Sequence, residues 1–194
     1  MNKKDKILDF FTSKFPLNTD GLEEFMDAFT VKRYNKEEIL LQANQKEKEL
    51  RFLEEGVVRE YFAYDGREMN TYFYTQPGFI TDFSSITKNV PTRKYQQCLS
   101  NVTMRILPKR TYEAFLEKYE CGRSVVNSIF QQVIQSKEQK EFKHFSLTPD
   151  QLYADLLENH REWLQKVPQY HIATYLRMTP ETLSRIRKRS LPTS

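Results

Sequence analysis

The middle of the chain, from about residue 34 to residue 107, consists of short runs of β-branched and aromatic residues separated by turn residues. Residues 50–53, 57–64 and 68–74 are three such runs, and the dipeptide Asp65-Gly66 connects the last two. Asp-Gly suits a two-residue hairpin turn, because both positions of that turn need a positive φ angle. Short strands with frequent turns are typical of an antiparallel sandwich or barrel. We therefore expect an all-β unit at the centre of the chain.

Helical periodicity flanks this unit on both sides. Up to about residue 31, and again after Pro108, apolar residues recur three and four positions apart, as they do in amphipathic helices. The residues that we expect to pack in the core are Ile7, Leu8, Phe11, Phe15, Leu22, Phe25, Met26, Phe29, Tyr112, Phe115 and Leu116.

A long helix without glycine is expected from residue 123 to about residue 145. Its apolar positions are Val126, Ile129, Phe130, Val133 and Ile134. This stripe needs a surface to cover it, and that surface is either the same helix of a second copy or, for the first turns, the β-unit of the same chain. The sequence leaves both alternatives open. Residues 136–143 are polar and suit a solvated hinge.

The C-terminal part is expected to be helical after a linker at residues 146–149. The first helix there carries Leu152, Leu156, Leu157 and Trp163, and a pair of short helices follows Pro168. The inner face of this pair is formed by Ile172, Ala173, Leu176, Leu183 and Ile186. Between the two helices, Thr179 is a good N-cap and Pro180 suits the first helical position. Two short helices of this kind, with a small residue at their crossing, are typical of a helix-turn-helix.

The outer face of the second helix then carries polar and basic side chains. Arg185 can donate to guanine O6 and N7, Glu181 can accept from cytosine N4, and Ser184 or Thr182 can reach a base or a phosphate. Lys188 and the arginines beside it would add phosphate contacts that depend on salt. The complete set of candidate DNA-binding residues is Gln169, Thr179, Pro180, Glu181, Thr182, Ser184, Arg185, Lys188 and Arg189.

The charge of the chain is concentrated in the same segment. The chain has 30 Lys and Arg against 26 Asp and Glu, a net charge of +4. From residue 168 to the end, Glu181 is the single acid among five basic residues, so this segment accounts for all of the net charge. The alternative interpretation is an ordinary solvated basic face.

One position departs from the usual helix-turn-helix pattern. The turn between the helices commonly holds glycine in a left-handed conformation, and Arg177 occupies that place here. A left-handed arginine would cost roughly 1–2 kcal/mol. A longer connection between the helices would avoid that cost.

The stretch VPQYHIATYLRMTPETLSRIRK is similar to the DNA-binding helices of the Crp/Fnr family of bacterial regulators, and the order of elements resembles that family over nearly the whole chain. In this resemblance Thr182 and Arg185 match positions for phosphate and base contact, and Glu181 matches a second base contact. Pro180 stands where many members have arginine. The sequence pattern "LYADLL…VPQ.HIA.YL" is most similar to that of family members from the Bacteroidetes. Since the chain ends soon after Arg189, no contact of a β-wing with DNA is expected.

The resemblance implies an α+β protein with three parts. Residues 1–118 would be a cyclic-nucleotide-binding-like sensor, an antiparallel β-roll (jelly roll) with flanking helices. Residues 119–145 would be a dimerisation helix, and residues 146–194 an all-α helix-turn-helix domain. The implied partners are double-stranded DNA and a second copy of the chain, with RNA polymerase as a candidate further partner.

The ligand cassette of that family is not preserved. The family uses a Gly-Glu pair for the ribose and an Arg-Ser/Thr pair for the cyclic phosphate, and the nearest matches here are Thr81-Asp82 and Thr92-Arg93. Asp82 is one methylene short, and a shift of one residue along a strand would turn Arg93 to the opposite face. We therefore expect neither cyclic AMP binding nor another cofactor. A pocket for another small molecule, or for none, would be lined by Phe79, Ile80, Asp82, Phe83, Ser84, Thr92 and Arg93.

Two alternatives compete with a DNA-binding regulator. A cupin-like enzyme would need metal-binding histidines on the strands, but His144, His160 and His171 all lie outside the β-region. The sequence also has no CxxC pair, no glycine-rich phosphate loop and no GxSxG elbow, so we expect no metal and no catalytic residue. The second alternative is an interaction adaptor, which keeps the fold but binds a protein through its helical tail.

The sequence also bears on where the protein works. The N-terminal residues lack a sustained apolar stretch with a small-residue cleavage site, and no run of 18 apolar residues occurs. We expect a cytoplasmic protein that does not bind membranes.

Overall fold

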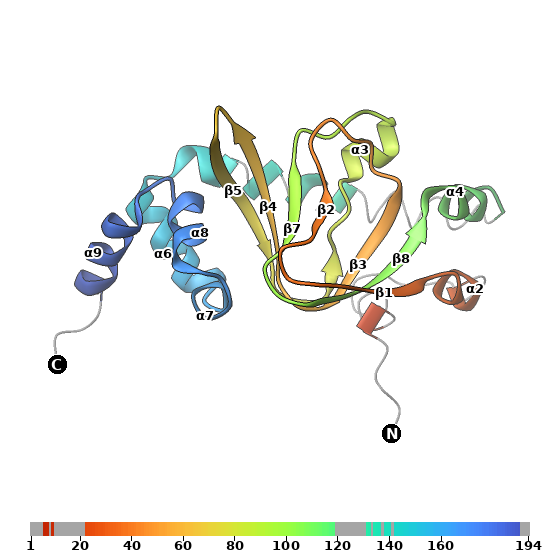
Figure 1. Ribbon diagram of the computed structural model, residues 1–194, viewed down its shortest axis with the longest axis horizontal. Coiled ribbons are helices and arrows are strands. Elements are labelled where there is room, and N and C mark those ends of the chain that lie inside the picture. The colour runs from red at the N-terminus through yellow and green to blue at the C-terminus, as the bar shows by residue number, and fades with distance from the viewer. Residues whose placement is uncertain are drawn as a thin grey trace, which may run out of the picture.

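The computed structural model describes residues 6, 7, 9, 22–118, 131, 132, 134–136, 138–140 and 142–190. A β-roll lies at the centre, with α2 and α4 at one end and the C-terminal helices α6 to α9 at the other (Figure 1). The expected α+β architecture, an antiparallel β-roll followed by a helical C-terminal part, is therefore confirmed.

Within the described residues the strands form two four-stranded antiparallel sheets. One sheet has, in spatial order, β1 (Thr30–Tyr34), β8 (Val102–Pro108), β3 (Glu49–Glu55) and β6 (Gly78–Phe79). The other has β2 (Ile39–Leu41), β7 (Tyr95–Cys98), β4 (Val58–Tyr64) and β5 (Arg67–Tyr74). Most neighbours within a sheet are distant in sequence, so the roll depends on long-range pairing.

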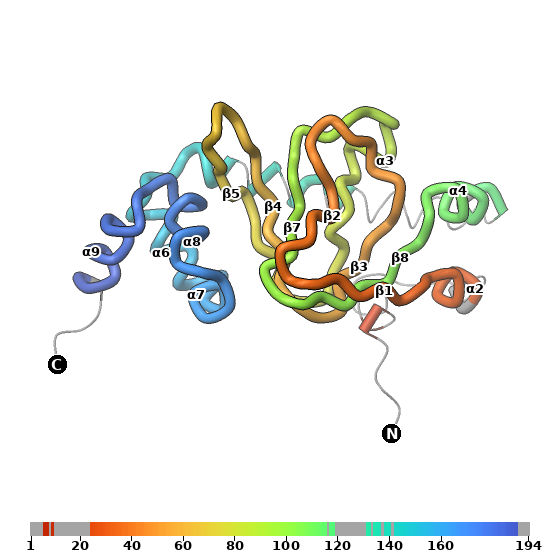
Figure 2. Tube along the Cα trace, in the orientation of Figure 1, coloured from red at the N-terminus to blue at the C-terminus, as the bar shows by residue number. Residues whose placement is uncertain are grey.

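The hairpin between β4 and β5 has the predicted turn. Asp65 and Gly66 have φ angles of 51° and 70°, and Tyr64 pairs with Arg67 across them. Both residues thus adopt the left-handed conformation that a two-residue turn of this type needs. The hairpin extends beside the C-terminal helices, as the Cα trace shows (Figure 2).

Three helices close one end of the roll: α2 (Leu22–Asp27), α3 (Phe83–Lys88) and α4 (Lys109–Lys118). Phe25, Phe83 and Tyr112 from these helices are buried with Phe52 of β3 in one apolar cluster, which also contains Ile7. The first helical region ends earlier than predicted, because residues 30–34 pair with β8 instead of continuing the helix. Of the predicted core residues, Leu8, Phe11, Phe15 and the side chains of Leu22 and Leu116 lie outside what the structure describes.

The segment that connects the roll to the C-terminal part is helical wherever it is described between residues 131 and 146. Val126, Ile129, Phe130 and Val133 of the predicted apolar stripe lie outside the described residues. Ile134 is described and is 37% exposed. The dimer seam therefore remains a prediction.

The C-terminal part contains α6 (Pro149–Asn159), α7 (Trp163–Lys166), α8 (Gln169–Tyr175) and α9 (Pro180–Ser190). The prediction of one helix carrying both Leu152 and Trp163 was wrong, because α6 ends at Asn159 and Trp163 begins α7. His160 caps α6 outside the helical conformation, with φ −141°, so the chain turns there. Trp163 nevertheless packs in the same core as Leu152.

The core of the C-terminal helices continues into the β-roll. Phe73 of β5 is buried in the same cluster as Trp163, and the two rings meet edge to face with centroids 5.0 Å apart. Helix α8 is therefore packed directly on β5 of the same chain, and α9 packs on α8.

Candidate nucleic-acid interface

The turn that ends α8 is a Schellman motif. The Met178 N–H donates to the Ala173 carbonyl at 3.0 Å, and the Arg177 N–H donates to the Thr174 carbonyl at 3.2 Å. This pair of hydrogen bonds satisfies the last carbonyls of a helix and needs a left-handed residue after the cap. The short loop from α8 to α9 thereby has a defined geometry.

Arg177 is that left-handed residue, with φ 56°. The longer connection that would have avoided this conformation is not present. A side chain at this φ costs roughly 1–2 kcal/mol relative to glycine. Arg177 Nη2 donates to the Leu147 carbonyl at 2.7 Å. This bond ties the loop to the residue that precedes the N-cap of α6, and it offsets part of the cost.

Helix α9 begins at the residues that the sequence predicted. Thr179 Oγ1 accepts a hydrogen bond from the Thr182 N–H at 3.3 Å, and Pro180 is the first helical residue. The pKa of the exposed Glu181 is lowered by a hydrogen bond from its own N–H and by the Thr179 hydroxyl. A carboxylate in the first turn also suits the positive end of the helix dipole.

The two faces of α9 are separated. Leu183 is fully buried and Ile186 is 6% exposed, as predicted for the inner face. On the outer face Glu181, Arg185 and Lys188 are exposed. Of the other candidate DNA-binding residues, Gln169, Thr179, Pro180 and Arg189 are exposed and Thr182 and Ser184 are half-buried.

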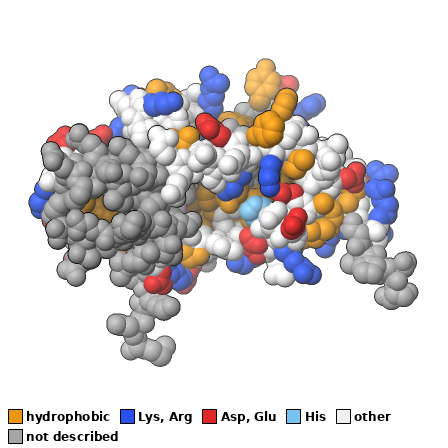
Figure 3. All heavy atoms as spheres, turned by 180° about the vertical axis from the view of Figure 1, so that it is seen from behind, with side chains coloured by type: hydrophobic (Ala, Val, Ile, Leu, Met, Phe, Trp, Pro, Cys, Tyr) orange, Lys and Arg blue, Asp and Glu red, His pale blue; other side chains and the backbone are white. Residues whose placement is uncertain are grey.

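The outer face of α9 is accessible to a large partner. α9 lies at one end of the molecule, with α6, α7 and α8 between it and the sheets (Figure 1). On the opposite view, basic side chains gather beside the C-terminus (Figure 3), where Arg187, Lys188 and Arg189 are exposed on the last turns of α9. Arg185 Nη2 donates to Thr182 Oγ1 at 3.2 Å, which holds the guanidinium over the first turn.

A polar contact between α8 and the sheet was missed by the sequence analysis. Asn70 of β5 is fully buried, and its side-chain amide donates to Thr174 Oγ1 at 2.5 Å and to the His171 carbonyl at 3.3 Å. Arg59 Nη1 lies 3.3 Å from His171 Nδ1. A guanidinium can only donate, so Nδ1 accepts and the imidazole is neutral. The signal in the sequence was a single asparagine within the strand 68–74.

The same surroundings perturb the titration of His171. Burial and the positive charge of Arg59 lower the pKa of His171 to about 4, and Glu68 opposes them. Protonation would replace an accepting nitrogen by a donor that faces the Arg59 guanidinium. This interface is therefore built for the neutral form of the histidine.

Two of the residues that match the family's ligand cassette, Asp82 and Thr92, are hydrogen-bonded to each other. The Asp82 carboxylate accepts from Thr92 Oγ1 at 2.6 Å and from the N–H groups of Ser84 and Ser85, so it caps α3. The Asp82 N–H donates to Glu47, which pairs with the buried Arg51. Internal groups thus satisfy the polar atoms of Asp82 and Thr92.

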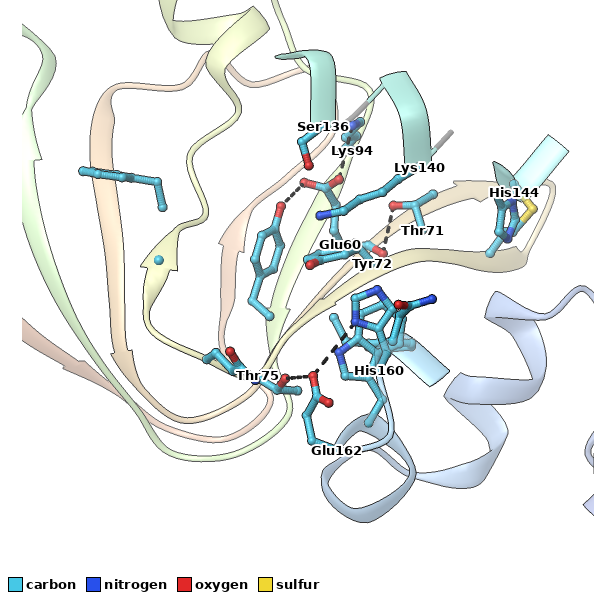
Figure 4. Close-up of a pocket in the computed structure, with 18 of the residues that line it drawn as sticks. Glu60, Thr71, Tyr72, Thr75, Lys94, Ser136, Lys140, His144, His160 and Glu162 are labelled. Carbon is cyan, nitrogen blue, oxygen red and sulfur yellow. Dashed lines mark hydrogen bonds and ion pairs between the residues drawn. The ribbon is translucent and has the colours of Figure 1, made fainter. Parts of the chain in front are cut away.

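The seven predicted pocket residues lie in different surroundings. Ile80 and Phe83 are buried in apolar clusters, and Ser84 and Arg93 are exposed. Phe79 does line a cavity, whose other walls come from β4, β5, residues 132–145 and the C-terminal helices (Figure 4). The other six predicted pocket residues do not line this cavity, and a pocket formed by them remains a prediction.

The described residues contain neither a candidate metal centre nor a candidate membrane-spanning helix. No three His, Cys, Asp or Glu side chains among them lie together in a way that could hold a metal ion. No helix in the described part of the chain is long and apolar enough to cross a membrane.

Comparison with solved structures identifies the fold. The chain superposes on FixK2 from Bradyrhizobium japonicum with a TM-score of 0.69 and 17% identity, over 83% of each chain. It matches the c-di-GMP-responsive global regulator CLP from Xanthomonas campestris (TM-score 0.67, 11% identity, 89% of this chain and 91% of the other). A third match is a putative Crp/Fnr-family transcriptional regulator from Eubacterium rectale (TM-score 0.65, 16% identity, 90% and 86%).

These neighbours share the β-roll and the helical C-terminal part. No family model matches the sequence, and no curated protein matches it either. At identities of 11–17% the superpositions establish the fold. The resemblance to Crp/Fnr regulators that the sequence indicated is thus confirmed at the level of the fold.

Proposed function

We propose that this protein is a sequence-specific DNA-binding transcriptional regulator of the Crp/Fnr type, with residues 146–194 as the DNA-binding unit. The observation that carries the proposal is the arrangement of α9, in which Leu183 and Ile186 are buried while Arg185 and Lys188 are exposed. A helix held in this way by its apolar side can place its polar side in the major groove. The fold shared with known regulators supports the same function.

Within this proposal Arg185 contacts a base, because a guanidinium can donate to both O6 and N7 of guanine. Lys188 and Arg189 contact phosphates, which adds affinity without sequence preference. Thr182 would position Arg185, because its hydroxyl accepts a hydrogen bond from the Arg185 guanidinium and would fix the direction of that group.

We further propose that the protein acts as a homodimer through the helix at residues 119–145. Support comes from the apolar stripe of that helix and from Phe142 and Phe145, which are 70% and 84% exposed on its distal end. A two-fold dimer would present two copies of α9 about one helical turn of DNA apart, roughly 34 Å. RNA polymerase is a candidate further partner, as the family resemblance implies.

Cyclic AMP is not the effector in this proposal. The Asp82 carboxylate, which matches the family's ribose-binding glutamate, already accepts hydrogen bonds from Thr92 Oγ1 and from two N–H groups of α3, so it is not free to bind a ribose hydroxyl. Arg93, the nearest arginine in sequence, is exposed and does not join this network.

The test is selection of binding sites from random duplex DNA, followed by footprinting. We expect protection of a two-fold symmetric site, and loss of that protection with Arg185→Ala. Arg110→Ala is the matched control, because Arg110 is also exposed but lies on α4 at the other end of the molecule (Figure 1). Binding without any sequence preference, or none at all, would favour an interaction adaptor instead.

A further inference from the structure

A cavity of about 860 Å³ lies where three parts of the chain meet. One wall comes from β4, β5 and β6. A second comes from the helical segment before α6, and a third from the C-terminal part (Figure 4). The second wall contains Gln132, Ser136, Lys140, His144 and Phe145, and the third contains Asn159, His160, Glu162, Trp163 and Arg177. Volumes of 300–1,000 Å³ are typical of sites for small organic molecules. None of the polar residues that match the family's cassette lines this cavity.

The wall on the C-terminal side is aromatic. The rings of His160 and Trp163 are stacked, with centroids 4.2 Å apart and planes at 12°. Tyr72 of β5 meets Trp163 edge to face, with centroids 5.1 Å apart. Trp163 itself is buried, whereas Tyr72 and His160 are only half-buried, so these two rings offer surface for contact with another flat ring.

The buried carboxylate of the cavity, Glu60, already has hydrogen-bond and ion-pair partners. Glu60 is 3% exposed, accepts hydrogen bonds from the Tyr74 hydroxyl at 3.2 Å and the Gln96 amide at 3.0 Å, and pairs with Lys94 at 3.2 Å. A buried charge with three donors around it needs no further partner. Glu60 therefore does not call for a cationic ligand.

Lys140 is the side chain that an anion would complement. Its ammonium stands 4.0 Å from the centroid of the Tyr72 ring and points across the cavity toward the sheet (Figure 4). None of the ion pairs between described residues includes Lys140, and burial lowers its pKa. Among the described residues, the charged side chains that line the cavity are three cations, Lys94, Lys140 and Arg177, and two carboxylates, Glu60 and Glu162.

We propose that this cavity binds a small aromatic acid, with its ring against Tyr72 and His160 and its acid group at Lys140. Tyr72 touches both Lys140 and Trp163, so the ring site and the anion site are close enough for one small molecule to fill both. Such a ligand would contact β5 and the C-terminal helices together, and would hold the two parts of the chain against each other.

The proposal is tested on the full chain with two probes that share their ring system. 1-Anilinonaphthalene-8-sulfonate carries an anionic group, and N-phenyl-1-naphthylamine is neutral. Trp163 is the single tryptophan of the chain, so its emission reports on probes that enter the cavity. We expect the sulfonate to bind and to quench Trp163 emission, with an affinity that falls as ionic strength rises, whereas binding of the neutral probe is insensitive to salt.

Lys140→Gln should weaken binding of the sulfonate about tenfold and change binding of the neutral probe by less than about twofold. Lys143→Gln is the matched control on the same helical segment, because Lys143 pairs with Asp155 and does not line the cavity. It should leave both affinities unchanged.

The proposal fails if Lys140→Gln binds the sulfonate as tightly as the wild-type protein does, or if it loses both probes equally. It also fails if the wild-type protein shows no salt-sensitive preference for the sulfonate, a result that needs no variant. DNA binding is measured separately, so these outcomes are independent of the proposed function.

Discussion

The side-chain amide of Asn70 on β5 donates a hydrogen bond of 2.5 Å to the hydroxyl of Thr174 on α8, 104 residues along the chain. The same amide group reaches the His171 carbonyl, and Asn70 is fully buried. The helix-turn-helix pair is therefore fixed to the β-roll by specific polar contacts as well as by the apolar contact of Phe73 and Trp163.

Replacement of Asn70 should loosen this interface. In Asn70→Ala the Thr174 hydroxyl and the His171 carbonyl lose a buried partner, so we expect a loss of about 1–3 kcal/mol in the free energy of unfolding. Asn159→Ala is the control, since the amide of Asn159 bonds Asp155 at an exposed position, and it should cost less than about 0.5 kcal/mol. Equal costs for the two variants, measured by denaturant unfolding, would contradict the assignment.

The stability of the protein should fall as the pH drops from about 6.5 toward 4. His171 has a folded-state pKa of about 4, below the unfolded value of 6.5, so in this range the unfolded chain binds a proton that the folded chain does not. The stabilisation is complete above pH 6.5 and is lost on acidification, by at most about 3 kcal/mol. His171→Gln should show a flatter dependence between pH 4 and 6.5, and parallel curves for the two proteins would refute this role.

At position 177 glycine should give a more stable protein than alanine does, the reverse of the usual order in helices. Both Arg177→Ala and Arg177→Gly lose the hydrogen bond to Leu147, but glycine alone removes the strain at φ 56°. We expect the glycine variant to be the more stable by about 1 kcal/mol. Lys188 is an exposed position inside α9, and there the alanine variant should be more stable than the glycine variant by a similar amount. Thermal unfolding of the four variants decides the matter.

Asp82 should behave as a structural cap. Asp82→Ala removes the acceptor for Thr92 and for two N–H groups of α3, so we expect a loss of about 2 kcal/mol in the free energy of unfolding. Asparagine is also a good N-cap, so Asp82→Asn should cost less than half as much. Cyclic AMP added to the wild-type protein should not raise its melting temperature, and a clear increase would show that the cassette still binds the nucleotide.

Arg185 and Lys188 should differ in what they contribute to DNA binding. Arg185→Ala is expected to cost about 1–3 kcal/mol and to relax the preference at one base pair, whereas Lys188→Ala should weaken all sequences alike and reduce the salt dependence. Affinities for the selected site and for its single-base variants, measured at two salt concentrations, separate the two effects. If Arg185→Ala lost affinity equally for all sequences, as Lys188→Ala should, Arg185 would be a phosphate contact instead.

Much of the fold followed from local patterns in the sequence. The turn at Asp65-Gly66, the inner face of Leu183 and Ile186, and the N-cap at Thr179 each depend on residues close together in the chain, and such local preferences are expressed in almost any context. The same is true of the exposure of Arg185, which follows from the helical period once the inner face is known.

Other features depend on contacts between distant segments, which no local pattern contains. The strand at residues 30–34 forms because β8 offers a partner, and α6 stops before Trp163 because the chain must turn there to bury that ring beside Phe73. The neutral state of His171, the internal bonding of Asp82 and the aromatic cavity at Lys140 all arise where β5, α3 or the C-terminal helices meet. The sequence by itself determined the central β-unit, its turn at Asp65-Gly66, the helical C-terminal part and the side of α9 that faces outward. Only the tertiary structure decided which polar groups are paired inside and where a cavity remains, because burial and pairing are properties of segments brought together by folding.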